Sequence, residues 1–142
     1  MARKRKDTRY FTPAEANNML PLVRAIVKDI VDLAHALRDQ NARLERLSLD
    51  GVARGILTPE QLDEEQAAFE KDQEQLQAYV EELRGLGVEM KDLLVGLVDF
   101  PGWMDDREVC LCWKLGEAEV AWWHETNAGF RGRQPLPVHA ES

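Results

Sequence analysis

The sequence lacks the features by which most secreted proteins, membrane proteins and enzymes are recognised. Its only two cysteines, Cys110 and Cys112, give no disulfide framework, and a bridge between such near neighbours on one strand would be strained. No apolar run reaches the roughly 18 residues of a membrane span, and no apolar stretch of a secretory signal follows the basic N-terminus. No phosphate-binding loop, zinc-protease motif or serine-hydrolase motif occurs. We therefore expect a cytoplasmic protein with reduced cysteines and no membrane association, and we assign it no catalytic residue.

Positive charge is scarce outside the first nine residues. The net charge is −8, yet residues 1–9 contain five basic side chains and one acidic one, so the remainder is more acidic than the total. Such a body repels phosphate backbones, which argues against nucleic acid as the main partner. We expect residues 1–9 to form a disordered basic tail, although a contact with a polyanion stays open.

Two segments of the sequence carry the same signal for the start of a helix. "TPAE" at 12–15 and "TPEQ" at 58–61 each place a threonine N-cap before a proline, with Glu15 or Gln61 completing a capping box. They predict helices over 12–47 and 58–84. Pro21 lacks a backbone donor and predicts a kink or break near Met19–Leu20.

Apolar residues recur every seven positions in both segments, which is the spacing of a helical seam. The two series are Val23, Ile30, Leu37 and Leu44, and Leu62, Phe69, Leu76 and Leu83. Antiparallel pairing of residues whose numbers sum to 106 matches all four layers. We expect a long helical hairpin that self-associates, because one hairpin covers only one stripe of each helix. The most acidic stretch, between Pro59 and Leu83, also leaves open a basic protein partner.

Short apolar runs separated by turn residues follow the hairpin and predict an antiparallel meander over 88–125. The expected strands are 88–91, 97–100, 108–115 and 119–124, with "PGWMDDR" separating the second from the third. Residues 126–142 read as an irregular segment. The sequence thus predicts one α+β domain over 1–142: a long antiparallel two-helix hairpin followed by a small antiparallel β-meander.

The densest stretch of reactive side chains is "CLCWKLGEAEVAWWHE", residues 110–125. Alternation along 108–115 places Val109, Leu111 and Trp113 on a core face and both cysteines on the other. A two-residue turn at Gly116–Glu117 would pair residues whose numbers sum to 233, which sets Cys110 opposite Trp123. A helix over 117–125 is the open alternative.

On that register His124 faces away from the two cysteines. A thiolate pair would then need further ligands from elsewhere to hold a soft metal ion, so we predict neither a metal site nor a cofactor. Free cysteines commonly serve as small buried apolar groups.

Five residues remain as candidates for binding a ligand. His124 and Glu125 are neighbours at a strand end, and the predicted register leaves Trp123 in need of its own cover. Two arginines on the following glycine-rich loop could hold a carboxylate or a phosphate. The candidates are Trp123, His124, Glu125, Arg131 and Arg133. Pairing of the arginines with Glu117 or Glu125 is the structural alternative.

Three separated motifs resemble a bacterial family known as domain of unknown function 2203. They are "YFTPAEANNMLPLVR", "GVEMKDLLVGLVDFPG" and "CWKLGEAEVAWWHETNAGFRGRQPL", which together span Tyr10 to Leu136. The resemblance implies a single-domain cytoplasmic protein and transfers no activity, cofactor or site residue.

Matched heptads without a catalytic motif favour a non-enzymatic interaction or scaffold protein, with a homodimer as the expected assembly. The alternative function is a small-anion binding protein or enzyme built on His124, Arg131 and Arg133.

Overall fold

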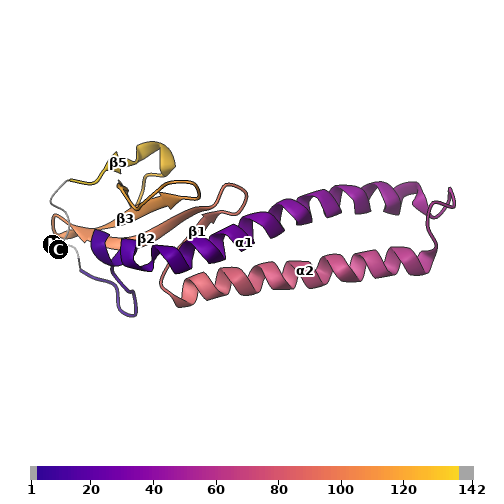
Figure 1. Cartoon of the computed structure of the whole chain (residues 1–142), viewed down its shortest axis with the longest axis horizontal. Coiled ribbons are helices and arrows are strands. Elements are labelled where there is room, and N and C mark those ends of the chain that lie inside the picture. Colours follow the sequence, from indigo (N-terminus) through magenta and orange to yellow (C-terminus); the bar gives the residue numbers. More distant parts are fainter. Residues whose placement is uncertain (1–2, 138–142) are drawn as a thin grey trace.

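The computed structural model describes residues 3–137, which form two long contacting helices followed by a five-stranded antiparallel sheet. The helices run side by side far beyond the sheet, which packs at the end of the hairpin where α1 begins and α2 ends (Figure 1). The predicted α+β class, with a helical hairpin before a β-meander, is confirmed.

Helix α1 spans Pro13–Arg46 and begins with the predicted capping box. The side chain of Thr12 accepts from the backbone N–H of Glu15, and the Glu15 carboxylate accepts from the N–H of Thr12. Pro21 lies inside the helix and the helix continues through it, so the predicted break is wrong. An exposed position in the third turn tolerates the missing donor, because the packing of later turns holds the helix.

Helix α2 spans Pro59–Gly85 and starts with the same capping box, here between Thr58 and Gln61. A short π-helix, η1 (Leu47–Gly51), and a turn connect it to α1. At its C-terminal end Gly87 has φ = +88°, a left-handed conformation that glycine adopts without strain, and the chain there turns into the sheet.

Two polar contacts between the helices join residues that the predicted pairing would not have placed opposite each other. Gln40 donates to Asp72 over 3.2 Å, and Arg43 forms a bidentate pair with Glu65. A constant sum of 106 would have opposed these two residues to Gln66 and Asp63. In the distal half of the hairpin long polar side chains reach across the seam, and apolar spacing alone does not set their pairing.

The sheet is a plain meander with the strand order β1-β2-β3-β4-β5. Its strands are β1 (Glu89–Asp92), β2 (Leu97–Met104), β3 (Arg107–Lys114), β4 (Trp122–Glu125) and β5 (Gln134–Pro135). The segment "PGWM", expected to separate two strands, continues β2, and Pro101 pairs with Cys110. The C-terminal segment, expected to be irregular, contributes a 3-10 helix, η2 (Phe130–Gly132), and β5, and its residues 138–142 lie outside the described part.

The pairing of β3 with β4 differs from the prediction by one residue. Cys110 lies opposite His124, and Leu111 lies opposite Trp123. The predicted turn at Gly116–Glu117 and the predicted strand start at 119 are both wrong, because residues 115–121 connect the strands and β4 begins only at Trp122. The alternative helix over 117–125 does not form. A slip of one residue turns each side chain of β4 to the other face of the sheet.

Asn17 of α1 gives the physical reason for this connection. Its side chain accepts from the backbone N–H of Val120 over 2.7 Å and donates to the carbonyl of the same residue over 3.2 Å. The amide thus satisfies both backbone groups of Val120 in place of a strand partner. Residue 120 is tied to the helix, and ladder pairing with β3 begins two residues later.

The hydrophobic core lies between one face of the sheet and the adjoining ends of the helices. Trp113 and Phe100 are the largest fully buried side chains, and Phe11 packs edge-on against Phe100. The core face of β3 is the predicted one. From the hairpin the core takes Val23, Ile26, Val27, Ile30 and Leu83.

Residues 3–9 make defined contacts with the sheet. Arg5 forms a bidentate ion pair with Glu108, whose carboxylate also accepts from the hydroxyl of Tyr10 over 2.7 Å. Within residues 3–9, Arg5 thus has an ion-pair partner that a fully solvated tail would lack, and residues 1 and 2 of the expected tail lie outside the described part. No helix within residues 3–137 is both long enough and apolar enough to cross a membrane.

Candidate functional site

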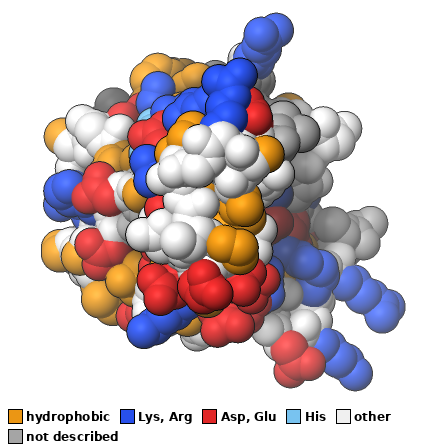
Figure 2. Space-filling view, turned by 90° about the vertical axis from the view of Figure 1, so that its right-hand side faces the viewer, with side chains coloured by type: hydrophobic (Ala, Val, Ile, Leu, Met, Phe, Trp, Pro, Cys, Tyr) orange, Lys and Arg blue, Asp and Glu red, His pale blue; other side chains and the backbone are white. Residues whose placement is uncertain are grey.

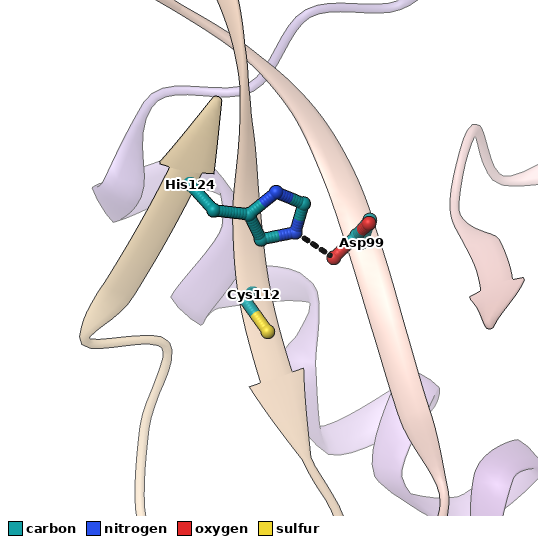
Figure 3. A group of neighbouring side chains, drawn as sticks. All are labelled: Asp99, Cys112 and His124. Atoms are coloured by element: carbon teal, nitrogen blue, oxygen red, sulfur yellow. Dashed lines mark hydrogen bonds and ion pairs between the residues drawn. The ribbon is translucent and has the colours of Figure 1, made fainter. Parts of the chain in front are cut away.

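Three reactive side chains meet on the face of the sheet opposite α1. Asp99 from β2 and His124 from β4 point toward each other, and Cys112 lies beside them on the intervening strand β3 (Figure 3). Their ligand atoms all lie within 4.8 Å of one another. All three are buried, with exposures of 3% for Asp99, 0% for Cys112 and 4% for His124.

Strand alternation and register bring these three residues together. Asp99 is the register partner of Cys112 across β2 and β3, and both alternate with core residues on their own strands. His124 joins them because β4 is shifted by one residue from the predicted pairing. The expectation that His124 and the cysteines occupy opposite faces is therefore wrong.

Both nitrogens of the His124 ring have hydrogen-bond partners. Nδ1 lies 2.8 Å from the backbone oxygen of Glu125, and Nε2 lies 3.0 Å from Oδ1 of Asp99. A carbonyl oxygen can only accept, so Nδ1 carries a proton. The Nε2–Oδ1 hydrogen bond needs a second proton, carried either by the imidazole or by the carboxyl group.

Burial governs the acidity of the neighbouring groups. It raises the pKa of Asp99, and this effect outweighs the opposing influence of His124 and Lys91. Burial, with the nearby Asp99 charge, also raises the pKa values of Cys110 and Cys112, each to about 12. With such pKa values neither cysteine is a thiolate nucleophile at neutral pH.

A small pocket opens beside the cluster. It has a volume of about 200 Å³, and Asp99 and His124 form part of its wall. Figure 1 shows the segment that contains η2 lying over this face of the sheet, on the side away from the helices. The remaining lining residues are Lys91, Leu97, Cys110, Thr126, Ala128, Gly129 and Phe130. The pocket is of a size for water or a very small ligand.

Two of the five predicted ligand residues face the core side of the sheet. Trp123 is half-buried and packs against the hydrophobic core, which supplies the cover that the sequence could not identify. Glu125 forms a bidentate pair with Arg107, and the guanidinium of Arg107 also lies 5.6 Å from the centre of the Trp123 ring. Trp123 and Glu125 therefore do not share a site with the ring of His124.

The two arginines of the C-terminal loop do not line the pocket beside His124, as bounded by residues 3–137. Arg133 pairs with Glu117 at 2.8 Å, and its guanidinium stacks 4.6 Å from the ring centres of Trp122 and Phe130. This pairing is the structural alternative that the sequence left open. Arg131 is exposed on η2.

Sequence reasoning missed Asp99 and the part played by Cys112. A signal for Asp99 was present, because one acidic residue stands between the apolar residues Val98 and Phe100, and alternation places it on the outer face. A buried carboxylate needs a hydrogen-bond or charge partner, so the sequence already indicated that Asp99 would have one. That the partner is His124 depended on the β3–β4 register.

The cluster combines one imidazole nitrogen, one carboxylate oxygen and one sulfur in a water-poor site. Such a donor set can hold a proton between Asp99 and His124, or it can hold a divalent transition-metal ion.

Comparison with known proteins gives one match. A family model described as "Uncharacterized conserved protein (DUF2203)" matches residues 9–136. No curated protein and no solved structure matches the chain.

Proposed function

Because this chain belongs to the DUF2203 family, whose description assigns no activity, we propose from the structure that it is an interaction protein that self-associates through its helical hairpin. One observation carries the proposal. The turn between β1 and β2 exposes three consecutive branched apolar side chains, Leu93, Leu94 and Val95, at 37%, 39% and 44%. Turns are ordinarily polar, and a run of exposed apolar residues indicates a contact surface.

The apolar turn, defined as residues 93–95, is held in one conformation. The carboxylate of Asp92 accepts from the backbone N–H groups of Leu94 and Val95, and Nε2 of His35 in α1 lies 2.8 Å from the carbonyl oxygen of Leu94. Since a carbonyl oxygen only accepts, His35 donates to it. A surface ordered in advance loses little conformational entropy when it binds.

A groove between the helices continues this apolar surface. It has a volume of about 450 Å³, and Leu93 and Leu94 form one edge of it. Its floor is largely apolar, from Ala34 and Leu37 of α1 and Leu76 and Val80 of α2. The turn and groove together form one patch that a partner's apolar side chains can fill.

Helix α2 is incompletely covered within one chain. Of its residues only Leu83 is fully buried, whereas Leu62, Phe69 and Leu76 of the same heptad series remain partly exposed. A second hairpin laid on this side would complete the burial, as in a four-helix bundle.

The charges of the two helices favour one orientation of a second copy. Helix α2 carries nine acidic residues and two basic ones, whereas the distal half of α1 is balanced, with Arg38, Arg43 and Arg46 against Asp32, Asp39 and Glu45. Viewed from the hairpin tip, acidic side chains gather along the lower edge, on the α2 side (Figure 2). Pairing α2 with α2 would be repulsive, so a two-fold dimer brings α1 of one copy against α2 of the other.

Sedimentation equilibrium tests the proposal. The wild-type chain should be a dimer at about 50 µM, and Leu94→Ser should weaken the dimer at least about tenfold, because it removes apolar area from the patch centre. Leu22→Ser is the matched control, since Leu22 is 50% exposed but lies outside the turn and groove. A wild-type monomer at about 50 µM, or equal weakening by both substitutions, would reject the proposal.

The free thiols of Cys110 and Cys112 fit a reducing compartment, which supports a cytoplasmic location. The acidic α2 also fits a basic protein partner on the outer side of the hairpin, which the dimer would leave accessible.

A further inference from the structure

The Asp99–Cys112–His124 cluster has the composition and arrangement of a metal-binding site. The three side chains come from three consecutive strands, and their donor atoms lie within 4.8 Å of one another around the middle strand (Figure 3). Strands of a sheet are rigid supports, so the donors are positioned before any ligand arrives.

The second nitrogen of His124 supplies an independent observation. Nδ1 donates to the backbone oxygen of Glu125 over 2.8 Å, which fixes the ring and directs Nε2 toward Asp99. Metal-binding histidines almost always have such an outer partner, commonly a backbone carbonyl. With a proton on Nδ1, Nε2 is the nitrogen that can offer its electron pair to an ion once the proton shared with Asp99 has left.

We propose that Asp99, Cys112 and His124 bind one borderline divalent transition-metal ion of the zinc or cobalt type. The mixture of sulfur, nitrogen and oxygen donors selects this class, because a thiolate disfavours Mg²⁺ and Ca²⁺. The proposal is independent of self-association through the hairpin.

The present separations fit such an ion with small side-chain adjustments. Nε2 and Oδ1 are 3.0 Å apart, and all three donor atoms lie within 4.8 Å. Ligands at about 2.0–2.3 Å from a tetrahedral ion lie roughly 3.3–3.8 Å from one another. The ion would take the place of the hydrogen bond between His124 and Asp99.

Replacing two protons of the cluster by one divalent ion leaves its net charge unchanged. As hydrogen-bonded in the structure, the cluster holds one proton between Nε2 and Oδ1 and one proton on the sulfur of Cys112. A divalent cation replaces both protons and leaves a neutral imidazole, a carboxylate and a thiolate around it. Two protons depart, the net charge of the buried cluster is unchanged, and no oxidant or reductant is needed.

Two of the three proposed ligands border the small pocket, so an open coordination position would be reached from that side. Asp99 and His124 line the pocket of about 200 Å³, and Cys110 lies in the same wall. Three protein ligands with one position open to a small pocket is the pattern of a site that binds water or a small ligand on the metal.

Cobalt binding to the full-length chain tests the proposal. The untagged, reduced protein is freed of metal with a chelator, dialysed, and titrated with Co²⁺ alone. We expect about one ion per chain, tetrahedral visible absorption, and a thiolate-to-cobalt charge-transfer band in the near ultraviolet, all displaced by Zn²⁺. Absence of the charge-transfer band at about 1 mM Co²⁺ would overturn the proposal.

The two cysteines provide a matched pair of variants. Cys110 lies on the same face as Cys112, but its sulfur is not part of the three-donor cluster. Because the chain has only these two cysteines, a band that persists in Cys110→Ser assigns the thiolate to Cys112. A band that is lost in Cys110→Ser, or that survives Cys112→Ser, overturns the assignment.

Asp99→Asn tests the oxygen ligand without removing the hydrogen-bonding shape of the side chain. It should lower Co²⁺ affinity by more than about 100-fold, which exceeds the usual effect of losing an outer partner. Circular dichroism of the metal-free variant reports whether the fold is retained. Unchanged Co²⁺ affinity in a folded Asp99→Asn chain would remove Asp99 from the site and overturn the three-ligand proposal.

Discussion

The Nε2 atom of His124 in β4 lies 3.0 Å from Oδ1 of Asp99 in β2, across the intervening strand β3. This hydrogen bond joins two strands that are not neighbours in the sheet, and it satisfies two buried polar side chains at once. It makes the outer face of a small sheet a defined polar site.

Two substitutions of Asp99 distinguish the stabilising effect of its hydrogen bond from that of its charge. Asp99→Ala leaves Nε2 of His124 buried without its partner, and we expect a loss of about 1–3 kcal/mol in the free energy of unfolding. Asp99→Asn can donate to Nε2 while Nδ1 still donates to Glu125, so its loss should be clearly smaller. Urea unfolding in the presence of a chelator measures both, and equal losses would show that the hydrogen bond contributes nothing.

Asn17 should be essential for the β3–β4 connection. Asn17→Ala leaves the backbone N–H and carbonyl of Val120 without their partners at a position only 2% exposed, so we expect a loss of about 2 kcal/mol or more.

The adjacent Asn18 is exposed and provides the matched control. Asn18→Ala should stay within about 0.5 kcal/mol of the wild type. Thermal unfolding of the two variants gives the comparison, and similar stabilities for Asn17→Ala and Asn18→Ala would contradict the role assigned to the Asn17 side chain.

Gly96 ends the apolar turn in a left-handed conformation at φ = +77°, and a Cβ there would lie 2.7 Å from Cβ of Leu115 and 3.0 Å from Cγ1 of Val27. Gly96→Ala therefore combines backbone strain with close contacts to Leu115 and to Val27 of α1. We expect a loss of about 2–4 kcal/mol, measured by denaturant unfolding.

Gly55 separates these two effects. It has a similar φ of +71°, but a Cβ there meets nothing within 4 Å. Gly55→Ala should lose only the backbone contribution of about 1 kcal/mol. If the two substitutions cost the same, the close approach of the apolar turn to α1 is not a constraint.

The contact between the N-terminal segment and the sheet should depend on pH. Burial acts to raise the pKa of Glu108, but the hydrogen bonds from Arg5 and Tyr10 outweigh it, so the pKa lies below its usual value. A carboxyl group with a lowered pKa in the folded state stabilises the fold above about pH 4.3, its unfolded value. That stabilisation is lost as the pH falls through the lowered pKa.

Comparison of the wild type with Glu108→Gln isolates this effect. The wild type should be more stable at pH 7, and the difference should shrink steadily as the pH falls below about 4. Urea unfolding at a series of pH values measures the difference. A difference that stays constant over that range would show that the carboxylate charge of Glu108 does not hold Arg5.

Local signals in the sequence were sufficient for the helices and for the face pattern of β3. The threonine–proline starts specify capping boxes that depend only on residues three apart, and both form as predicted. Alternation along β3 is equally local, so the core face of Val109, Leu111 and Trp113 followed from the sequence alone. The α+β order followed from the change of apolar period between the two parts of the chain.

The candidate site depended on contacts between distant residues. Asn17, 103 positions from Val120 in the chain, fixes where β4 begins, and a single-residue shift there decides which face His124 occupies. Turn residues alone favoured the other register. The polar contacts in the distal half of the hairpin also differed from the predicted pairing. Arg43 and Gln40 have long side chains, so their length and the charge of the nearby acidic residues determine which residues they contact.

The sequence by itself determined the type and order of the main elements, since capping, period and alternation act over a few residues. Only the tertiary structure decided that Asp99, Cys112 and His124 share one buried site. They come together only when three strands pair in one register. The Asn17 side chain of the first helix helps to set that register, and no pattern within the strands themselves reveals this contact.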